Sequence, residues 1–309
     1  MGTVGRPRIS IVTPTLNRAR YLGEAIDSVL AQNHPDVEHI IVDGMSTDGS
    51  AELLARHPHL RVIREPDTGL YDALNKGLRA ASGEIIGHLN SDDLYAPGVF
   101  AEVADAFAAP DVDAVFGGAE VFEGDAPEHR RVVRRFARPE DIELSVFNTT
   151  VGVPITNARF FHRRVYDRVG YADLRYRIAA DRDFLLRVAL TEPRAVLLDR
   201  IVYQYRMHPD SLTINRDEAA AAKVRDEYLA IAEEFLAKTG LPDAARTCCR
   251  RWHERESALA ALRSLQAGAW TRFGDYARRG LRANAAWPVM LARHFAGELR
   301  DRLLGRESA

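Results

Sequence analysis

The chain has 309 residues, of which 46% are hydrophobic and 28% charged, which is typical of a folded protein with one large α/β domain plus an appendage. Its 42 Lys+Arg and 44 Asp+Glu give a formal net charge of -2. It therefore lacks the basic surplus that nucleic-acid binding requires, and we expect no nucleic-acid partner. The sequence contains no apolar signal segment and no run approaching ~18–20 apolar residues, which predicts a cytoplasmic protein.

Short apolar runs alternate with amphipathic segments in the first part of the chain. These patterns predict strands at residues 9–13, 39–42, 60–64, 84–89 and 114–116, and helices at residues 21–31, 70–80 and 97–108. Strands separated by helices of this length imply right-handed crossovers and a mainly parallel sheet covered on both faces. Ligands bind such sheets beyond the carboxyl ends of the strands, where Thr13, Asp43 and Asn90–Asp93 lie. We therefore expect a binding site at this edge.

The pattern is mixed in the middle of the chain and helical at its end. We predict a two-stranded ribbon at residues 119–122 and 132–136, short helices at 165–169 and 184–190, and strands at 196–198 and 201–205. Beyond Asn215 the sequence is rich in Ala, Arg, Glu and Leu, which predicts helices at residues 218–238, 243–266, 270–281 and 287–304. The expected organisation is one domain over residues 1–215 and a helical extension over residues 216–309.

The last predicted helix mixes Trp287, Phe295 and leucines with several arginines. This composition fits a helix at a membrane surface, which would place the protein at the inner face of the plasma membrane. It fits a homodimer contact or plain packing as well, and these alternatives stay open.

The segment Asn90-Ser91-Asp92-Asp93 is the most distinctive polar cluster in the sequence. Adjacent carboxylates repel each other unless a cation or hydrogen-bond donors compensate their charge. Hard divalent ions such as Mg²⁺ or Mn²⁺ prefer oxygen ligands and often join one or two carboxylates to substrate phosphates. The same aspartates could instead cap a helix that begins near Pro97. A metal site and a helix cap are therefore both open at this cluster.

The sequence as a whole resembles the inverting family-2 glycosyltransferases of the GT-A fold. The resemblance is carried, in the family's order between residues 7 and 215, by Ile11–Asn17, Val42–Gly49, Glu65–Gly77, Gly83–Asp93, Ala180–Arg187 and Tyr205–Ser211. It implies an enzyme that moves a sugar from a nucleotide-diphosphate sugar to an acceptor hydroxyl with inversion, assisted by Mg²⁺ or Mn²⁺. UDP is the first expectation for the nucleotide, with dTDP or GDP as alternatives, and the acceptor is a saccharide or a lipid-linked group. The expected setting is polysaccharide, glycolipid or other glycoconjugate biosynthesis.

The resemblance also implies roles for individual residues. Thr13, Pro14 and Asp43 would line the nucleoside pocket, and Asp72 and Asn75 would face the donor. The metal and ribose motif would be Asp92 and Asp93, completed by His208 at the diphosphate, and Asp181 would be the catalytic base. One base and one metal suffice for an inverting displacement.

Each of these residues has a simpler interpretation. Asp181 could be the N-cap of a helix, His208 an exposed loop histidine, Asp43 a turn-stabilising residue and Asp72 part of a solvated helix face. A dinucleotide oxidoreductase is disfavoured because no G-x-G-x-x-G follows the first strand, and a sugar-nucleotide pyrophosphorylase because residues 14–18 contain no glycine. The non-enzymatic alternative is a catalytically degenerate sugar-nucleotide-binding or scaffold protein that acts through its helical tail.

Overall fold

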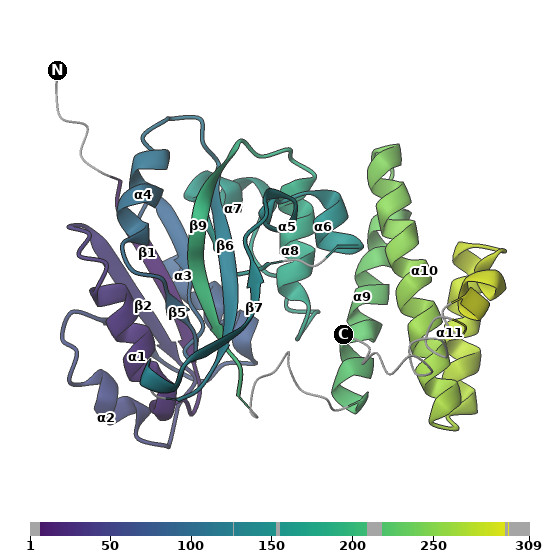
Figure 1. Cartoon of the computed structure of the whole chain (residues 1–309), viewed down its shortest axis with the longest axis horizontal. Helices are drawn as coiled ribbons and strands as arrows, with labels where there is room; N and C mark the ends of the chain where they lie inside the picture. Colours follow the sequence, from purple (N-terminus) through teal and green to yellow (C-terminus); the bar gives the residue numbers. More distant parts are fainter. Residues whose placement is uncertain (1–6, 126, 153–154, 209–217, 294–295, 297–309) are drawn as a thin grey trace. The chain divides into compact units, whose positions relative to one another are not determined.

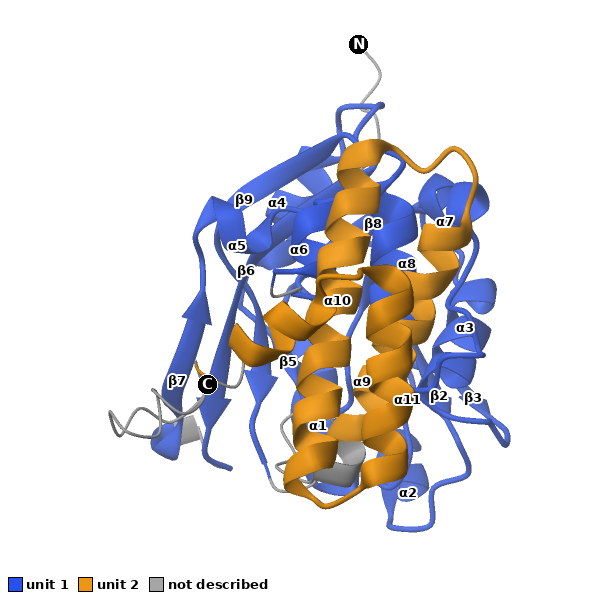
Figure 2. Ribbon diagram, turned by 90° about the vertical axis from the view of Figure 1, so that its right-hand side faces the viewer, with its two compact units in different colours: residues 1–214 blue, residues 215–309 orange. Residues whose placement is uncertain are grey.

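The structure is a computed structural model that describes residues 7–125, 127–152, 155–208, 218–293 and 296. The chain divides into two compact units, Met1–Ile214 and Asn215–Ala309, which Figure 2 shows in blue and orange.

The first unit is built on a mixed β-sheet (Figure 1). Its strands are β1 (Ile9–Thr15), β2 (Val37–Asp43), β3 (Arg61–Arg64), β4 (Ile85–His88), β5 (Leu94–Tyr95), β6 (Ala114–Glu123), β7 (Arg131–Phe136), β8 (Arg159–His162) and β9 (Ala195–Arg206). Its helices are α1 (Ala19–Leu30), α2 (Ser50–Leu54), α3 (Leu70–Ala80), α4 (Val99–Ala106), α5 (Pro139–Ile142), α6 (Val146–Thr150), α7 (Arg163–Val169) and α8 (Ala180–Ala189), with a 3-10 turn at Pro127–His129.

The strand order is β3-β2-β1-β4-β8-β6-β9-β5, with β7 paired to β6. The four strands β3, β2, β1 and β4 are parallel neighbours, and β6 and β9 form a further parallel pair. The carboxyl ends of β1, β2 and β4 therefore meet at one edge of the sheet, as the sequence predicted. The GT-A architecture, a mostly parallel sheet flanked by helices, is confirmed.

Helices cover both faces of this sheet (Figure 1). Buried residues of α1 and α4 pack with Ile9, Ile11 and Phe160 on one face. On the other face, α7 and α8 pack against Phe116 and Phe161. Neighbouring residues of β6 (Val115 and Phe116) and of β8 (Phe160 and Phe161) thus enter opposite cores, which is the period-2 geometry of a sheet covered on both sides.

Several details differ from the sequence prediction. The strand β9 is continuous over Ala195–Arg206, where separate strands at residues 196–198 and 201–205 were expected. The strand β8 was not predicted; it lies antiparallel between β4 and β6 and interrupts the parallel order. The strand β6 is continuous where two separate strands were expected, because Gly117 and Gly118 continue it without a side chain. A Cβ atom on Gly117 would lie 2.1 Å from Cγ2 of Val202, so the glycine permits close approach of β9.

The second unit consists of helices α9 (Glu218–Ala237), α10 (Asp243–Gln266) and α11 (Trp270–Ala283), followed by helical residues 287–293. Residues 294, 295 and 297–304 of the last predicted helix lie outside the described residues. The core of this unit includes Leu229, Tyr276 and Trp287, and the Trp287 indole nitrogen donates to Ser257 at 2.9 Å. None of the described helices combines the length and the apolar character needed to cross a bilayer.

Candidate active site

The acidic segment Asn90–Asp93 follows β4 at the carboxyl edge, and its two aspartates have different environments. Asp93 is buried, and its carboxylate accepts hydrogen bonds from the Arg206 backbone N–H at 2.8 Å, the Tyr203 hydroxyl at 2.9 Å and the Asn90 amide at 3.0 Å. Burial, together with the negative charge of Asp92, raises the pKa of Asp93 to about 7. Asp93 is thus held inside the protein by β9 and by its own turn.

Asp92 turns its carboxylate toward polar side chains from distant segments. Its Oδ2 lies 3.1 Å from Nε2 of His208 and 3.7 Å from Nε of Arg18. The His208 ring packs on Tyr21 of α1 with centroids 4.6 Å apart. The helix α4 has Gly98 as its N-cap, without a side-chain cap. The helix-cap interpretation of the acidic cluster is therefore wrong.

The donor set at Asp92 is compatible with a divalent cation. Across the described part of the chain, no group of three or more His, Cys, Asp or Glu side chains is arranged to hold a metal. Mg²⁺ and related ions are nevertheless often bound by one or two protein ligands plus substrate phosphates. A carboxylate oxygen and an imidazole nitrogen 3.1 Å apart provide two such ligands. Asp92 and His208 are therefore the residues of this edge that could hold a divalent cation.

Arg206 fixes the geometry around Asp92, a role the sequence analysis did not identify. Its Nε donates to the Asp92 carbonyl at 3.0 Å and its Nη2 pairs with Glu24 at 2.8 Å. The guanidinium also stacks on Tyr21 and Phe122. In the sequence, Arg206 was distinguished only by its place in the motif Tyr205–Ser211, which also contains His208. Residues 209–211 of that motif lie outside the described residues.

The three residues expected to line the nucleoside pocket, Thr13, Pro14 and Asp43, are buried near the carboxyl ends of β1 and β2. Thr13 and Pro14 lie in β1, and the Thr13 hydroxyl is 3.0 Å from Nε2 of His39. The Asp43 carboxylate is fully buried, accepting from the Ser46 backbone N–H at 2.9 Å and pairing with Arg64 at 3.0 Å. The turn-stabilising contact proposed for Asp43 is therefore present, and a nucleotide contact by any of these three residues stays a prediction.

Asp72 and Asn75 lie on α3 and make different contacts. The Asn75 amide is buried and bonded to both backbone groups of Ala172, at 2.8 and 3.1 Å. Asp72 accepts from the Thr68 backbone N–H at 3.0 Å and pairs with Lys76, and these two contacts lower its pKa. Asn75 thus joins α3 to the loop before α8, while Asp72 keeps an ionised carboxylate.

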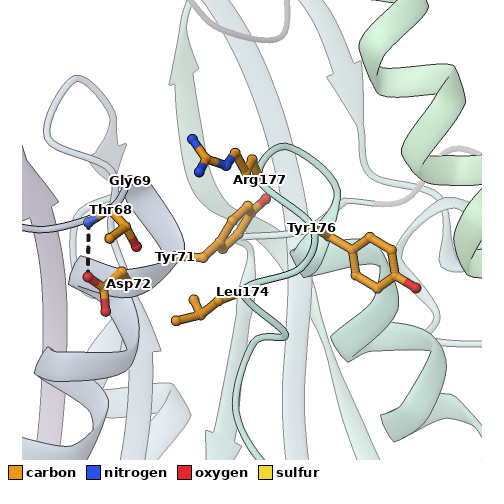
Figure 3. Close-up of a pocket in the computed structure, with 7 residues that line it drawn as sticks. All are labelled: Thr68, Gly69, Tyr71, Asp72, Leu174, Tyr176 and Arg177. Atoms are coloured by element: carbon orange, nitrogen blue, oxygen red, sulfur yellow. Dashed lines mark hydrogen bonds between the residues drawn. The ribbon is translucent and has the colours of Figure 1, made fainter.

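A small pocket lies beside Asp72 (Figure 3). It is lined by Thr68, Gly69, Tyr71, Asp72, Leu174, Tyr176 and Arg177. Its volume of about 40 Å³ holds water or a single functional group, and not a whole nucleotide. The pocket lies between the start of α3 and the loop at residues 171–178.

Asp181 lies in the first turn of α8. The N-cap of that helix is Ala179, so the interpretation of Asp181 as the cap is wrong. Burial raises the pKa of Asp181, an effect partly offset by hydrogen bonds from the Arg182 backbone and the Tyr71 hydroxyl. Tyr71 also donates to the Ile178 carbonyl at 2.9 Å, so the first turns of α3 and α8 lie together. Since α3 follows β3, Asp181 shares the edge of the sheet with Asp92.

Comparisons with known proteins show the family of the chain. The model of the glycosyl transferase family 2 matches residues 10–170, and the chain belongs to this family. A PGL/p-HBAD biosynthesis glycosyltransferase of Mycobacterium tuberculosis is 33% identical over 59% of this chain and 69% of its own length. The glycosyltransferase EpsJ of Bacillus subtilis is 30% identical over 72% of this chain and 67% of its own length.

Solved structures share the fold. S. aureus TarS residues 1–349 in complex with UDP-GlcNAc match with a TM-score of 0.67 and 17% identity, covering 98% of this chain and 93% of that one. The mannosyltransferase PcManGT from Pyrobaculum calidifontis, in complex with GDP-Man and Mn²⁺, matches with a TM-score of 0.59 and 22% identity over 98% of this chain and 89% of that one. The chain is accordingly a glycosyltransferase with the GT-A fold.

Proposed function

We propose that this glycosyltransferase moves a sugar from a nucleoside-diphosphate sugar to an acceptor hydroxyl with inversion, assisted by Mg²⁺ or Mn²⁺. The observation that carries the proposal is the Asp92–His208 pair, 3.1 Å apart, at the edge of the sheet where Asp181 also lies. UDP is the expected nucleotide, with dTDP and GDP as alternatives, since related folds bind UDP-GlcNAc and GDP-Man. The acceptor is a saccharide or a lipid-linked group in glycoconjugate biosynthesis.

Asp181 acts as the base in this proposal. The acceptor hydroxyl must lose its proton as it attacks the anomeric carbon, and a carboxylate within hydrogen-bond reach takes that proton. Burial raises the pKa of Asp181, so its carboxylate binds a proton more strongly than an exposed aspartate does. A single base is sufficient because inversion proceeds by one displacement without a covalent sugar–enzyme intermediate.

Asp92 and His208 hold the diphosphate side of the donor. A divalent ion bound there would supply Lewis-acid stabilisation of the departing nucleoside diphosphate. Arg206 keeps Asp92 in place through its carbonyl, and Arg18 adds a positive charge 3.7 Å from the carboxylate. Asp93, whose carboxylate oxygens accept three hydrogen bonds inside the protein, supports the turn and leaves direct contact with the ion to Asp92.

Two variants separate catalysis from binding. Asp181→Asn is expected to abolish release of nucleoside diphosphate from a sugar nucleotide while keeping Mn²⁺-dependent UDP binding in calorimetry. Asp92→Asn is expected to remove the Mn²⁺ dependence of binding. Asp167→Asn, which removes an exposed carboxylate from α7, is the matched control and should behave as the wild type. Undiminished turnover by Asp181→Asn would refute the base assignment.

The helical unit is proposed to serve the catalytic unit by packing, by homodimer contact or by binding a membrane surface. It carries an apolar pocket of about 280 Å³ lined by Leu262, Leu265, Pro288, Leu291 and Ala292. Truncation after Asn215 tests this role. A folded, soluble and fully active remnant would contradict the packing version.

A further inference from the structure

Arg159 carries a buried guanidinium group that the fold uses only in part. The residue begins β8 and is 3% exposed. Its Nε donates to the Ile155 carbonyl at 2.6 Å, and its guanidinium carbon lies 4.5 Å from the centre of the Phe116 ring. Across the described part of the chain, neither Nη atom of Arg159 has a hydrogen-bond partner. Both NH₂ groups of the guanidinium are therefore available to a ligand.

The positive charge of Arg159 is not balanced by a carboxylate of the described residues. Burial lowers the pKa of Arg159 to about 10, so the guanidinium stays protonated at neutral pH. The nearby Tyr205 hydroxyl does not neutralise it, because burial raises the pKa of Tyr205 to about 12. By contrast, Arg164 on the following helix pairs with Asp113 at 2.8 Å. A buried charge without a partner is strongly unfavourable, and such groups cluster at functional sites.

Arg159 lies at the same edge of the sheet as the proposed active site. The strand β8 runs antiparallel to β4, so its first residue lies where β4 ends and the segment with Asp92 begins. Arg159 pairs with Phe116 of β6, and Phe116 faces the core that α8 covers. The helix α8 also begins at this edge, and its first turn carries Asp181. Arg159 and Asp181 therefore belong to one face and one edge of the sheet.

A contact between α8 and the segment before β8 connects the two residues. Arg182, which directly follows Asp181, places its Nη2 3.4 Å from the Gly152 carbonyl, and Arg159 bonds to the Ile155 carbonyl. Three residues of chain span at most about 11 Å, so these two carbonyls lie close to each other. The arginine beside the proposed base and Arg159 thus contact the same short stretch of chain.

His88 adds a second unused polar atom beside Arg159. Gly87 of β4 pairs with Phe160 of β8, so the same register places His88 opposite Arg159 on one face of the sheet. The buried Nε2 of His88 has no hydrogen-bond partner among the described residues, whereas the side chain of Asn157 bonds to the ring. Burial lowers the pKa of His88 to about 4, so at neutral pH this ring offers a polar contact and no charge.

We propose that Arg159 binds an anionic group, a phosphate or a carboxylate, of the sugar acceptor. This inference rests on the proposed function and adds a property of the acceptor, its negative charge. A guanidinium binds either oxyanion through two parallel hydrogen bonds from its NH₂ groups. Asp181 then takes the proton of the acceptor hydroxyl while Arg159 holds the anion. Side chains at binding sites commonly change rotamer when a ligand binds, so the Arg159 side chain can turn toward an acceptor at the edge. A neutral saccharide leaves the guanidinium without a counter-charge and binds more weakly.

The test measures acceptor-like ligands binding to the full chain by calorimetry. UDP and Mg²⁺ are present at saturation, so that the proposed donor site is occupied and cannot bind the probes. The probes are glucose 1-phosphate, glucuronate and neutral glucose. The wild type should bind at least one of the two anions ~10-fold or more tightly than glucose, because hydrogen bonds to a charged group contribute about that factor. The anion that binds more tightly shows whether a phosphate or a carboxylate supplies the charge.

Two variants of Arg159 separate binding from a structural role. Arg159→Gln should lower the affinity for the preferred anion ~10-fold and leave UDP binding unchanged. The matched control is Arg168→Gln, which removes a half-exposed guanidinium paired with Asp113 on α7 and should keep the preference for the anion. Arg159→Met replaces the buried charge by an apolar side chain. Its melting temperature without ligand should equal or exceed that of the wild type, because the unpaired charge is unfavourable in the free protein.

The inference and the transferase proposal fail in different ways. A wild type that binds UDP with Mg²⁺, but binds neither anion or binds glucose as tightly, would overturn the role of Arg159 and leave the transferase proposal standing. Anion binding that Arg159→Gln leaves unchanged would do the same. A melting temperature of Arg159→Met well below that of the wild type would assign the guanidinium a structural role and also overturn the inference. A wild type that binds no nucleoside diphosphate would overturn the transferase proposal and, with it, this inference.

Discussion

Gly77 allows α3 to pack directly on the parallel strands that carry the site. A Cβ atom at this position would lie 2.3 Å from Cγ1 of Val12 and 3.0 Å from Cγ2 of Val42, both in fully buried residues. Carbon atoms pack at about 3.5–4.0 Å, so Gly77→Ala must displace the helix or a strand by about 1 Å. Overpacking of this kind costs up to about 3 kcal/mol, and alanine returns about 1 kcal/mol through helix propensity. The net expectation is a loss of about 2 kcal/mol.

Urea unfolding followed by circular dichroism measures this loss. With an m-value of about 3 kcal/mol/M, the midpoint of Gly77→Ala should fall by roughly 0.7 M. The matched control is Gly23→Ala in α1, where the nearest atom to a new Cβ is Cδ1 of Leu53 at 3.6 Å. That variant should be unchanged or more stable by about 0.5–1 kcal/mol. A Gly77→Ala protein as stable as Gly23→Ala would refute the packing argument.

Three further predictions concern single side chains. Because burial raises the pKa of Asp181, kcat/KM should fall as the pH is lowered through a value above the usual aspartate range; a profile that is flat there would contradict the base role. Burial lowers the pKa of His39 to about 3 in the folded protein, whereas the pKa of this histidine in the unfolded chain is about 6.5. As the pH falls below about 6.5, the unfolded chain therefore binds a proton at His39 that the folded protein does not bind. Stability is then lost with falling pH, by about 2 kcal/mol at pH 5, and urea titrations of wild type and His39→Gln at pH 7 and pH 5 should show that difference. Tyr203→Phe removes the hydroxyl that donates to Asp93 at 2.9 Å and accepts from the Asn90 backbone at 3.1 Å. It should cost about 1–3 kcal/mol of stability and weaken Mn²⁺-dependent UDP binding, and an unchanged protein would show that the hydroxyl does not support the acidic turn.

The parallel half of the sheet was predictable because each of its strands is an apolar run followed by a helix of regular periodicity. The strand β8 was not, because Arg159–His162 is too short to show a period. Its Phe160 and Phe161 enter opposite cores, so it has no polar alternation to indicate a strand. Residues 114–116 and 119–122 were predicted as separate strands, whereas Gly117 and Gly118 continue β6 and make room for Val202 and for the Phe136 carbonyl.

The position of the candidate site was predictable from the sequence, but the different environments of Asp92 and Asp93 within it were not. The carboxyl edge followed from the order of strands and motifs, which placed Asp92 and His208 in one region. The difference between Asp92 and Asp93 depends on Tyr203 and Arg206, which are more than 100 residues away in the chain.

The central claim is that this edge of the sheet transfers a sugar with inversion through Asp181. The most direct test is a proton NMR time course with Mg²⁺ and a panel of UDP-, dTDP- and GDP-sugars, which follows the anomeric signals of the donor and the first product. We predict consumption of one donor class, a product of opposite anomeric configuration, and no consumption by Asp181→Asn. A product that retains the configuration of the donor, or equal consumption by Asp181→Asn, would contradict the account.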